Sequence, residues 1–454
     1  MLSTLIGVFT YTSSAVFITY VCAIVVPFVN RRTLPEGNQH EFEWHIFVPC
    51  RDEEAVIGDT IFRLRATFPE AHVWIIDDDS HDGTAQVVTA LMHAAGEPDP
   101  LIHLVRRRPP HARTGKGDAL NAAYRELAAW LGRHQSWDKV IVGVVDADGV
   151  LAPNCLDVCA ADHLFGNGAV GAVQVEVRML NRHIEPDWPG RFRRWVGLKL
   201  VQLQDMEFRT AISAIQNSRT YAGTVAMGGN GQFTRMSALR SIAQGTGQPW
   251  RGLLLEDYEL GLHLLMAGWR TACTSDTHVS QEGLYSLRRF ITQRTRWGQG
   301  TMQCVRYLPA VWRSPHFRAV GVTEISYYLI QPWLQLVGAL LYPIPLLLLL
   351  WQMIDDPSRL STALTGSGWL MLILFLVLAT GPFVVWGFIY QYQGRREPGF
   401  LTGLGMGLGF ALYVCTFYVT SVRALWRMVR GQNGWSKTRR NAEVVTGREV
   451  AIEA

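Results

Sequence analysis

The chain has 454 residues, of which 48% are hydrophobic and only 18% are charged. Ordinary soluble domains carry about 25% charged residues, so this composition favours one catalytic domain joined to a membrane region. The net charge of +4 is modest and the basic residues are nearly all arginine. A nucleic-acid-binding protein would show a denser basic stripe, so we exclude nucleic acid as a partner.

Seven cysteines are scattered along the chain, some of them inside hydrophobic stretches. Their spacing contains no CxxC pair or Cys/His pattern typical of zinc, and it does not indicate a disulfide framework. A reducing, cytoplasmic setting for the soluble part is therefore expected.

Residues 1–30 are predicted to form an N-terminal transmembrane helix. The apolar run from Leu5 to Val29 is longer than the hydrophobic core of a signal peptide, and no basic segment precedes it. Asn30-Arg31-Arg32 follows the run, and the positive-inside rule places this end in the cytoplasm. A cleaved signal peptide is the alternative interpretation.

Residues 41–283 show short apolar runs alternating with helical stretches. We predict five strands, at His45–Pro49, Val73–Ile76, Leu101–Val105, Val140–Val145 and Ala169–Val175. Helices are predicted between them, at Glu54–Thr67, Thr84–Ala95 and Gly117–Leu131. This alternation predicts an α/β domain with a doubly wound, mostly parallel sheet. In such sheets the ligand lies beyond the carboxyl ends of the strands, where the acidic motifs of this chain fall.

Two predicted strand ends carry clusters of carboxylates. The first strand is followed by Arg51-Asp52-Glu53-Glu54, and the second by Asp77-Asp78-Asp79-Ser80-His81-Asp82. Neighbouring carboxylates repel one another, so they usually need a cation or a hydrogen-bonding ligand. The simpler alternative is that Ser80 and Asp82 cap the following helix, which accounts for one or two acids but not for three in a row.

Two further acidic pairs suit catalysis. Asp146 and Asp148 follow the fourth predicted strand, and carboxylates at this spacing on a turn can face one divalent ion that carries a diphosphate. Glu256-Asp257 opens a later helix, where acids often serve only the helix dipole. A carboxylate can also take a proton from an attacking hydroxyl, and Asp257 is the candidate for that role.

Residues 284–319 are predicted to form amphipathic interface helices. The segment Gln293-Arg294-Thr295-Arg296-Trp297 lies on a basic helix that begins near Leu287. Such a helix can rest on lipid headgroups. Its guanidinium groups can also stabilise a leaving diphosphate, and its indole can stack on a sugar ring. These two roles are compatible.

In their order along the chain, these motifs resemble the membrane-bound family 2 glycosyltransferases, such as cellulose, hyaluronan, chitin and poly-N-acetylglucosamine synthases. The matching motifs are P-x-x-(N/D)-E, D-D-x-S-x-D, K-x-x-A-L-N, D-x-D, E-D and Q-x-x-R-W, from about residue 45 to 300. The resemblance implies a GT-A (Rossmann-like) α/β catalytic domain beside an α-helical transmembrane region. It also implies a nucleotide-sugar donor, expected to be a UDP-sugar, a Mg²⁺ or Mn²⁺ ion, and inversion at the anomeric carbon.

The resemblance also implies a role for each matched residue. Donor binding is implied for Asp52, Glu53, Asp77, Asp78, Asp82, Lys116, Asp146, Gln293, Arg294 and Arg296. The implied catalytic residues are Asp257, as general base, and Glu256, and the implied metal ligands are Asp146 and Asp148. Acceptor binding is implied for Trp297 and for Asn230, which lies in a glycine-rich loop.

Residues 320–428 are predicted to form C-terminal transmembrane helices and residues 429–454 a cytoplasmic basic tail. The stretches Tyr327 to Ile354, Trp369 to Tyr390 and Phe400 to Trp426 can each cross a bilayer, which needs about 20 residues. Three crossings would place the basic tail outside, against the positive-inside rule. A hairpin or re-entrant pair over Val320 to Ile354, which contains three prolines, would remove the conflict.

The leading prediction is a processive enzyme that extends a polysaccharide from a nucleotide-sugar donor. We expect it to be a multi-pass protein of the cell (inner or plasma) membrane, with its catalytic domain in the cytoplasm. Its expected partners are the donor, a glycan or lipid acceptor, the bilayer and an accessory subunit. The second hypothesis is a single-transfer enzyme that makes a glycolipid or a polyprenyl-linked sugar. A protein of a different class, either a transporter or a non-catalytic sensor of sugar nucleotides, is the third. The sequence leaves the sugar and the linkage open.

Overall fold

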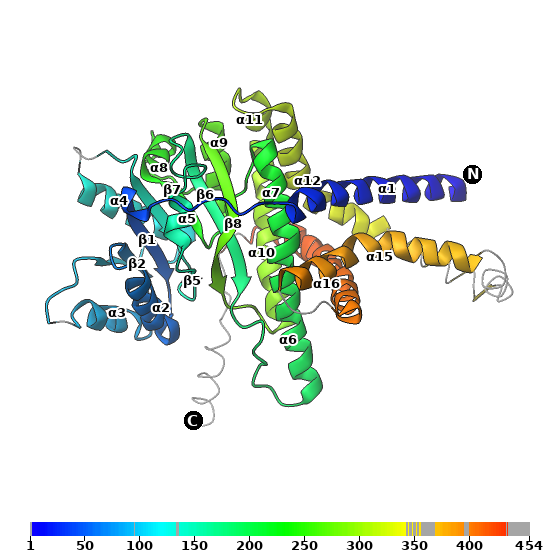
Figure 1. Cartoon of the computed structure of the whole chain (residues 1–454), viewed down its shortest axis with the longest axis horizontal. Coiled ribbons are helices and arrows are strands. Elements are labelled where there is room, and N and C mark those ends of the chain that lie inside the picture. The colour runs from blue at the N-terminus through cyan, green and yellow to red at the C-terminus, as the bar shows by residue number, and fades with distance from the viewer. Residues whose placement is uncertain are drawn as a thin grey trace.

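The structure is a computed structural model that describes residues 2–94, 96–132, 136–341, 368–394 and 399–432, with a few isolated positions near the C-terminal gaps. An α/β domain lies on one side of the molecule (Figure 1). A group of long helices extends away from it on the other side.

The α/β domain is built on an eight-stranded sheet in the order β3-β2-β1-β4-β7-β6-β8-β5. The strands are β1 (Glu43–Cys50), β2 (His72–Asp78), β3 (Ile102–Arg107), β4 (Val140–Val144), β5 (Val150–Leu151), β6 (Val170–Met179), β7 (Gln232–Arg235) and β8 (Arg270–Gln281). Strand β1 pairs in parallel with β2 and β4, and β2 pairs in parallel with β3. This half of the sheet confirms the predicted doubly wound arrangement.

The other half of the sheet differs from the prediction because it is mixed. Strand β7 runs antiparallel to both β4 and β6, and β5 runs antiparallel to β8, while β6 and β8 are parallel. The prediction omitted β5, β7 and β8. Strand β5 has only two residues, and most residues of β8 are only half-buried, so neither carries a strong apolar pattern.

Helices cover both faces of the parallel half. Helices α2 (Glu54–Thr67), α3 (Thr84–Met92) and α4 (Lys116–Leu131) follow β1, β2 and β3. On one face Ile57, Ile61 and Val88 pack against the strands, and on the other Leu120 and Leu127 do so. The predicted helix Glu54–Thr67 matches α2 at both ends, and the predicted strands match within a few residues.

Three helical segments lie between the sheet and the long helices. Helix α6 (Arg191–Met206), the π-helical turn η2 (Glu207–Ile212) and α7 (Ser213–Ala222) follow one another without a break. These segments and α10 (Leu287–Cys304) run up and down Figure 1, whereas α1 (Leu2–Val29) runs across it. The remaining short elements are η1 (Gln39–Glu41), α5 (Cys155–Ala160), α8 (Met236–Ala243), α9 (Glu256–Met266), η3 (Val305–Tyr307) and α11 (Leu308–Arg313).

The C-terminal helices are α12 (Ala319–Leu341), α15 (Gly368–Gln393) and α16 (Phe400–Val429). Helix α12 passes through Pro332 without ending there. The rest of the predicted hairpin, with Pro343 and Pro345, lies outside the described residues, as does most of the predicted basic tail. Within the described part of the chain, one helix, Phe400–Val429, is long and apolar enough to cross a membrane.

The long helices and the catalytic domain share a packed interface. Phe28 of α1, Met206 of α6, Phe290 of α10, Trp386 of α15 and Phe410 of α16 belong to one buried cluster. This interface holds α10, which carries the Q-x-x-R-W motif, against α16.

Glycines allow α15 and α16 to pack closely. A Cβ atom at Gly407 would lie 2.5 Å from Cα of Val384, and one at Gly387 would lie 2.3 Å from the carbonyl oxygen of Gly403. Small residues at such positions let two helix backbones approach each other, as they do in membrane proteins.

Candidate functional site

A cleft of about 1280 Å³ opens beyond the carboxyl ends of the parallel strands. It is lined by most of the predicted site residues, namely Glu53, Asp78, Lys116, Asp146, Asp148, Asn230, Glu256, Asp257, Gln293, Arg294, Arg296 and Trp297. Asp52, Asp77 and Asp82 are not among its lining residues.

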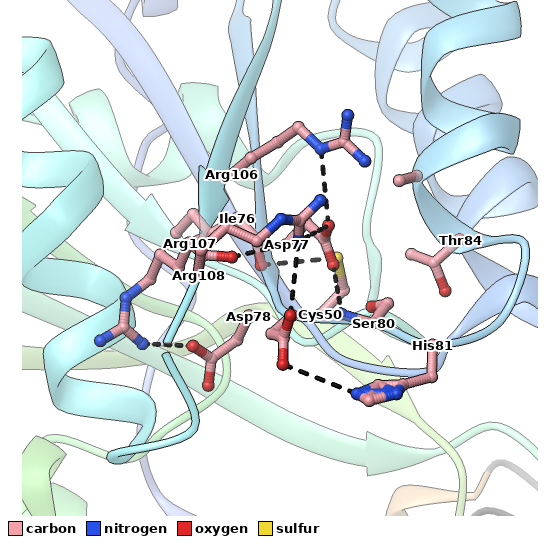
Figure 2. Close-up of polar contacts among 12 residues, drawn as sticks. Cys50, Ile76, Asp77, Asp78, Ser80, His81, Thr84, Arg106, Arg107 and Arg108 are labelled. Atoms are coloured by element: carbon pink, nitrogen blue, oxygen red, sulfur yellow. Dashed lines mark hydrogen bonds and ion pairs between the residues drawn. The ribbon is translucent and has the colours of Figure 1, made fainter. Parts of the chain in front are cut away.

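Asp77, at the end of β2, is turned away from the cleft. Its carboxylate is 1% exposed and lies 3.9 Å from Nε of Arg106 and 3.7 Å from Nη1 of Arg108 (Figure 2). It also accepts a hydrogen bond from the backbone N–H of Ser80 at 3.0 Å. We therefore do not carry Asp77 into the proposed donor site, since its contacts stabilise the loop after the strand.

Asp78 lies at the cleft and is bound by basic neighbours. Its carboxylate pairs with Arg107 of β3 (Figure 2). It also accepts the backbone N–H of Arg113 at 3.0 Å. Both Asp78 and Arg107 are buried. Their pairing follows from the parallel register of the strands, in which Asp78 lies opposite Arg107.

Asp82 and Asp52 organise the backbone beside the cleft. The carboxylate of Asp82 accepts the N–H of Thr84 at 3.0 Å and the N–H of Glu54 at 3.1 Å, so it serves the first turns of both α3 and α2. These contacts support the helix-capping alternative for Asp82, which lies one residue before Gly83 at the N-cap of α3, and donor binding by Asp82 stays a prediction. Asp52 has a positive φ of 54°, and its carboxylate accepts the N–H of His81 at 2.8 Å.

Lys116 joins three segments at the centre of the cleft. It is the first residue of α4, and its Nζ donates to Oδ1 of Asp146 and to the carbonyl of Gly229, each at 2.6 Å. Burial opposes the charge, but Asp146 and Glu256 raise the pKa of the Lys116 ammonium above its ordinary value. The ammonium is therefore a fixed positive charge beside Asp146, where a diphosphate can lie.

The acidic pair of α9 faces this ammonium. Burial and then the negative charge of Asp257 raise the pKa of Glu256 to about 7. Burial also raises the pKa of Asp257, although its carboxylate accepts the N–H of Tyr258 at 2.8 Å. A Cβ atom at Gly229 would lie only 3.1 Å from Oδ2 of Asp257, so glycine permits this close approach. Carboxylates of this kind suit proton transfer near neutral pH.

Arg296 brings a second positive charge from α10. Burial lowers the pKa of its guanidinium, and the charges of Glu256, Asp146 and Asp257 oppose that effect. The predicted neighbours of Arg296 on the helix, Gln293 and Trp297, line the same cleft. The second half of the Q-x-x-R-W motif thus reaches the acids that follow β4 and open α9.

Arg294 makes different contacts from those expected. Its Nη1 and Nη2 donate to the two carboxylate oxygens of Glu207 at 3.0 and 2.6 Å, and Nη2 lies 3.3 Å from the hydroxyl of Tyr413. The guanidinium is thus engaged by η2 and α16, and we do not carry Arg294 into the proposed donor site. Sequence reasoning missed Glu207 and Tyr413 because no local motif marks either residue.

Asn230 connects two loops at the floor of the cleft. Its Oδ1 accepts the N–H of Asp146 at 3.2 Å, and its Nδ2 donates to Oε1 of Gln281 at 2.9 Å. Asp148 accepts the N–H of Glu282 at 3.0 Å. Gln281 and Glu282 were also missed, because they lie at the end of β8, a strand that the apolar pattern did not reveal.

Asp146 and Asp148 have the right chemistry for Mg²⁺ or Mn²⁺. Both carboxylates line the cleft on the turn after β4, and oxygen ligands suit these hard cations. Within the described residues, no group of three or more His, Cys, Asp or Glu side chains is arranged to hold a metal ion. The two aspartates can therefore supply only part of a coordination shell, and a diphosphate and water would complete it.

Comparison with known proteins places this geometry in a family. The family described as "Glycosyltransferase like family 2" matches residues 43–300. A beta-monoglucosyldiacylglycerol synthase of Trichormus variabilis is 31% identical over 268 residues, or 58% of this chain and 49% of that protein. One of Synechocystis sp. is 29% identical over 272 residues, or 59% of this chain and 49% of that protein. The matched segment therefore spans about half the length of these relatives.

A solved structure has a similar fold over nearly the whole chain. It is the mannosyltransferase PcManGT of Pyrobaculum calidifontis, in complex with GDP-Man and Mn²⁺, with a TM-score of 0.51. It is 16% identical and covers 93% of this chain and 97% of its own. The GT-A, Rossmann-like α/β fold that the motifs implied is thus confirmed, whereas the polysaccharide-synthase subtype is not found among these relatives. Since the match over residues 43–300 covers more than half of the chain, the protein belongs to the family 2 glycosyltransferases.

Proposed function

We propose that the protein is a membrane-bound, inverting glycosyltransferase that moves a single sugar from a nucleoside-diphosphate donor to the hydroxyl of a lipid. One observation carries this proposal: the cleft that holds the acids continues between the long helices. Its lining residues there are Tyr20, Val21 and Ile24 of α1, Tyr327 and Tyr328 of α12, Phe383 and Trp386 of α15, and Phe410, Val414 and Phe417 of α16.

The two ends of this cleft suit the two ends of an amphiphile. The end beside Lys116, Asp146 and Asp257 is charged, and it suits a nucleotide sugar and a hydroxyl. The end between the helices is apolar and aromatic, and it suits an acyl or prenyl chain. A soluble sugar acceptor would not need the second end. The relatives named beta-monoglucosyldiacylglycerol synthases support a diacylglycerol-like acceptor and glucose as the first pair to test.

The reaction follows from the arrangement of charges. The acceptor hydroxyl attacks the anomeric carbon as its proton passes to Asp257, and the bond from that carbon to the diphosphate breaks. Lys116 and Arg296 stabilise the negative charge that develops on the departing diphosphate. Asp146 and Asp148 would hold the divalent cation, which when bound neutralises part of that charge. Attack from the side opposite the leaving group inverts the anomeric carbon.

We further propose that the long helices anchor the enzyme in a bilayer with the catalytic domain on the cytoplasmic side. Helices α1, α12, α15 and α16 contain 28, 23, 26 and 30 residues, so each has the length of about 20 residues that a crossing needs. Within the described residues, α16 alone also meets the requirement for apolar composition. Many of their large apolar side chains are exposed, among them Leu334, Val337, Leu340, Leu376, Val377, Leu401 and Leu412. Arg31 and Arg32 follow α1, and the positive-inside rule predicts that an end followed by basic residues lies in the cytoplasm.

Extension of a polysaccharide is the second candidate function. The observation that favours it is the indole of Trp297, which lines the cleft and could stack on the sugar at the end of a glycan. Such an enzyme would need no separate lipid acceptor once a glycan is bound.

The test measures sugar transfer by the purified protein in lipid nanodiscs. UDP-glucose, UDP-N-acetylglucosamine and GDP-mannose would each be supplied with Mg²⁺ or Mn²⁺, with and without diacylglycerol, and the products identified by mass spectrometry. We expect nucleoside diphosphate to be released only when the lipid is present, and each lipid product to carry one added sugar. This activity should be lost in Asp257→Asn. A ladder of glycans formed without added lipid would overturn the proposal in favour of the polymerase.

A further inference from the structure

A buried triad joins three separate helices beside the cleft. Glu207 of η2 binds Arg294 of α10 through both carboxylate oxygens, at 3.0 and 2.6 Å, and accepts the hydroxyl of Tyr413 of α16 at 2.6 Å. The side chains of Glu207 and Arg294 are each 7% exposed, and Tyr413 is 4% exposed. Both oxygens of the carboxylate thus face defined partners, and Glu207 and Arg294 also line the cleft.

The same guanidinium supports Trp297. Cζ of Arg294 lies 4.4 Å from the centroid of the Trp297 ring. Phe208, the residue after Glu207, meets the Trp297 ring edge-on, with centroids 6.3 Å apart and ring planes at 90°. The indole is therefore fixed by the Arg294 guanidinium of its own helix, α10, which Glu207 holds, and by the edge of Phe208 from η2.

We infer that Glu207 and Tyr413 are positioning residues for the acceptor: they fix the Arg294 guanidinium and, through it, the indole of Trp297 at the acceptor end of the cleft. This inference rests on the proposed function, in which Trp297 contacts the acceptor. It makes the placement of a long C-terminal helix, through Tyr413, part of the geometry of the active site.

Two features argue that the triad does more than stabilise the fold. A buried ion pair is a weak source of stability, because removing two charges from water offsets much of their attraction. Glu207 is also the first residue of the π-helical turn between α6 and α7. Such turns are rare and are frequently found at functional sites. The turn here delivers both Glu207 and Phe208 to the region of Trp297.

The experiment uses Glu207→Gln and Tyr413→Phe in the full-length protein, with Asp205→Asn as matched control. Asp205 is also fully buried two residues earlier, and it accepts the hydroxyl of Tyr390 of α15 at 2.6 Å. Its contacts to Arg209 and Tyr390 form a similar acid–arginine–tyrosine set that does not include Trp297.

The expected kinetic result is a rise in KM for the lipid acceptor of at least about tenfold in Glu207→Gln, since small displacements of positioning groups can cost up to about a hundredfold. Tyr413→Phe should show a smaller rise. The Kd for the donor should stay the same in both, because Lys116 and Asp146 are untouched. Equal rises in acceptor KM for Asp205→Asn and Glu207→Gln would overturn the inference.

The double variant Glu207→Gln with Arg294→Gln separates positioning from stability. Removing both charges leaves no unpaired charge in the interior, so the thermal unfolding midpoint should recover relative to Glu207→Gln alone. The acceptor KM should stay raised, because no cation then lies over Trp297. Recovery of the acceptor KM together with the midpoint would show a merely structural role.

A readout without turnover keeps the inference testable if the proposed function fails. Protein labelled with 5-fluorotryptophan gives a fluorine resonance for Trp297, identified by its loss in Trp297→Phe. That resonance should shift or broaden in Glu207→Gln and Tyr413→Phe and stay in place in Asp205→Asn. Absence of lipid transfer by the wild type would refute the proposed function, and an unmoved resonance would refute the positioning role.

Discussion

Replacing Glu256 by glutamine is expected to stabilise the folded protein at alkaline pH. Glu256 is only 9% exposed at the beginning of α9. Burial and the charge of Asp257 raise its pKa from 4.5 to about 7. This change corresponds to about 3 kcal/mol of folding free energy, because each pKa unit is worth about 1.4 kcal/mol. The wild-type fold thus retains a buried carboxylate that destabilises it whenever the carboxylate is ionised.

The sign of the pH dependence follows from which state holds the proton more tightly. The folded state keeps the proton of Glu256 up to about pH 7, whereas the unfolded chain releases it near 4.5. The contribution of Glu256 to stability therefore falls as the pH rises from 4.5 to 7, and its full cost is present above 7. Glutamine stays neutral, so the stability advantage of Glu256→Gln over the wild type should grow over that range.

The assay is thermal unfolding in detergent between pH 4.5 and 8.5, without divalent cation or donor. Glu126→Gln, an exposed position on α4, is the control and should behave like the wild type. Sugar transfer should fall in Glu256→Gln even as stability rises, which is the usual relation between active-site strain and activity. Equal pH profiles for wild type and Glu256→Gln, or an advantage that shrinks as the pH rises, would refute the reasoning.

Three further predictions concern the general base, the packing of the long helices and two half-buried histidines. Asp257→Asn should lower kcat by about 10²–10⁴-fold, since general-base catalysis contributes about that much. The donor Kd, measured by calorimetry, should be unchanged. Loss of donor binding would instead identify Asp257 as a donor ligand. Gly407→Leu should lower stability by about 1–3 kcal/mol, as overpacking does, because a Cβ there would lie 2.5 Å from the backbone of α15. Gly405→Leu is its control in thermal unfolding, because an added Cβ there would have no atom within 4 Å apart from its own helix backbone and chain neighbours. Equal midpoints for the two variants would contradict the close packing. The free energy of unfolding should also fall as the pH drops from 6.5 towards 4. Burial lowers the pKa of His72 and of His103 to about 4 in the folded state, so these two histidines bind protons in the unfolded chain at a higher pH than in the folded one. The double variant His72→Phe with His103→Phe should flatten that acid slope in the same assay, and an unchanged slope would show that other groups cause it.

The α/β domain could be predicted because its signals are local. The apolar run of β4 and the amphipathic pattern of α2 are each formed by residues that are close together along the chain. The acids that follow these strands could be placed at one edge because parallel strands end together. Lys116, Asp146 and Asp257 accordingly meet in the cleft, as their order along the chain suggested.

Which acids face the cleft was decided only by the tertiary structure. Asp77 and Asp78 are adjacent, yet successive residues of a strand point to opposite faces, so Asp78 lies at the cleft and Asp77 is buried beside Arg106 and Arg108. Asp82 binds the backbone of two helices, a role that a motif match cannot distinguish from ligand binding.

The family, the order of the motifs and the long apolar segments could be predicted without the structure, because each depends on residues that are neighbours along the chain. The partner of Arg294 was decided by tertiary structure, since Glu207 and Tyr413 lie 87 and 119 positions away along the chain. Our proposal of a lipid rather than a glycan acceptor rests on the same kind of fact. Only the packing of α1, α12, α15 and α16 shows that an apolar path joins the acids, because a cleft is made by surfaces that no stretch of sequence contains alone.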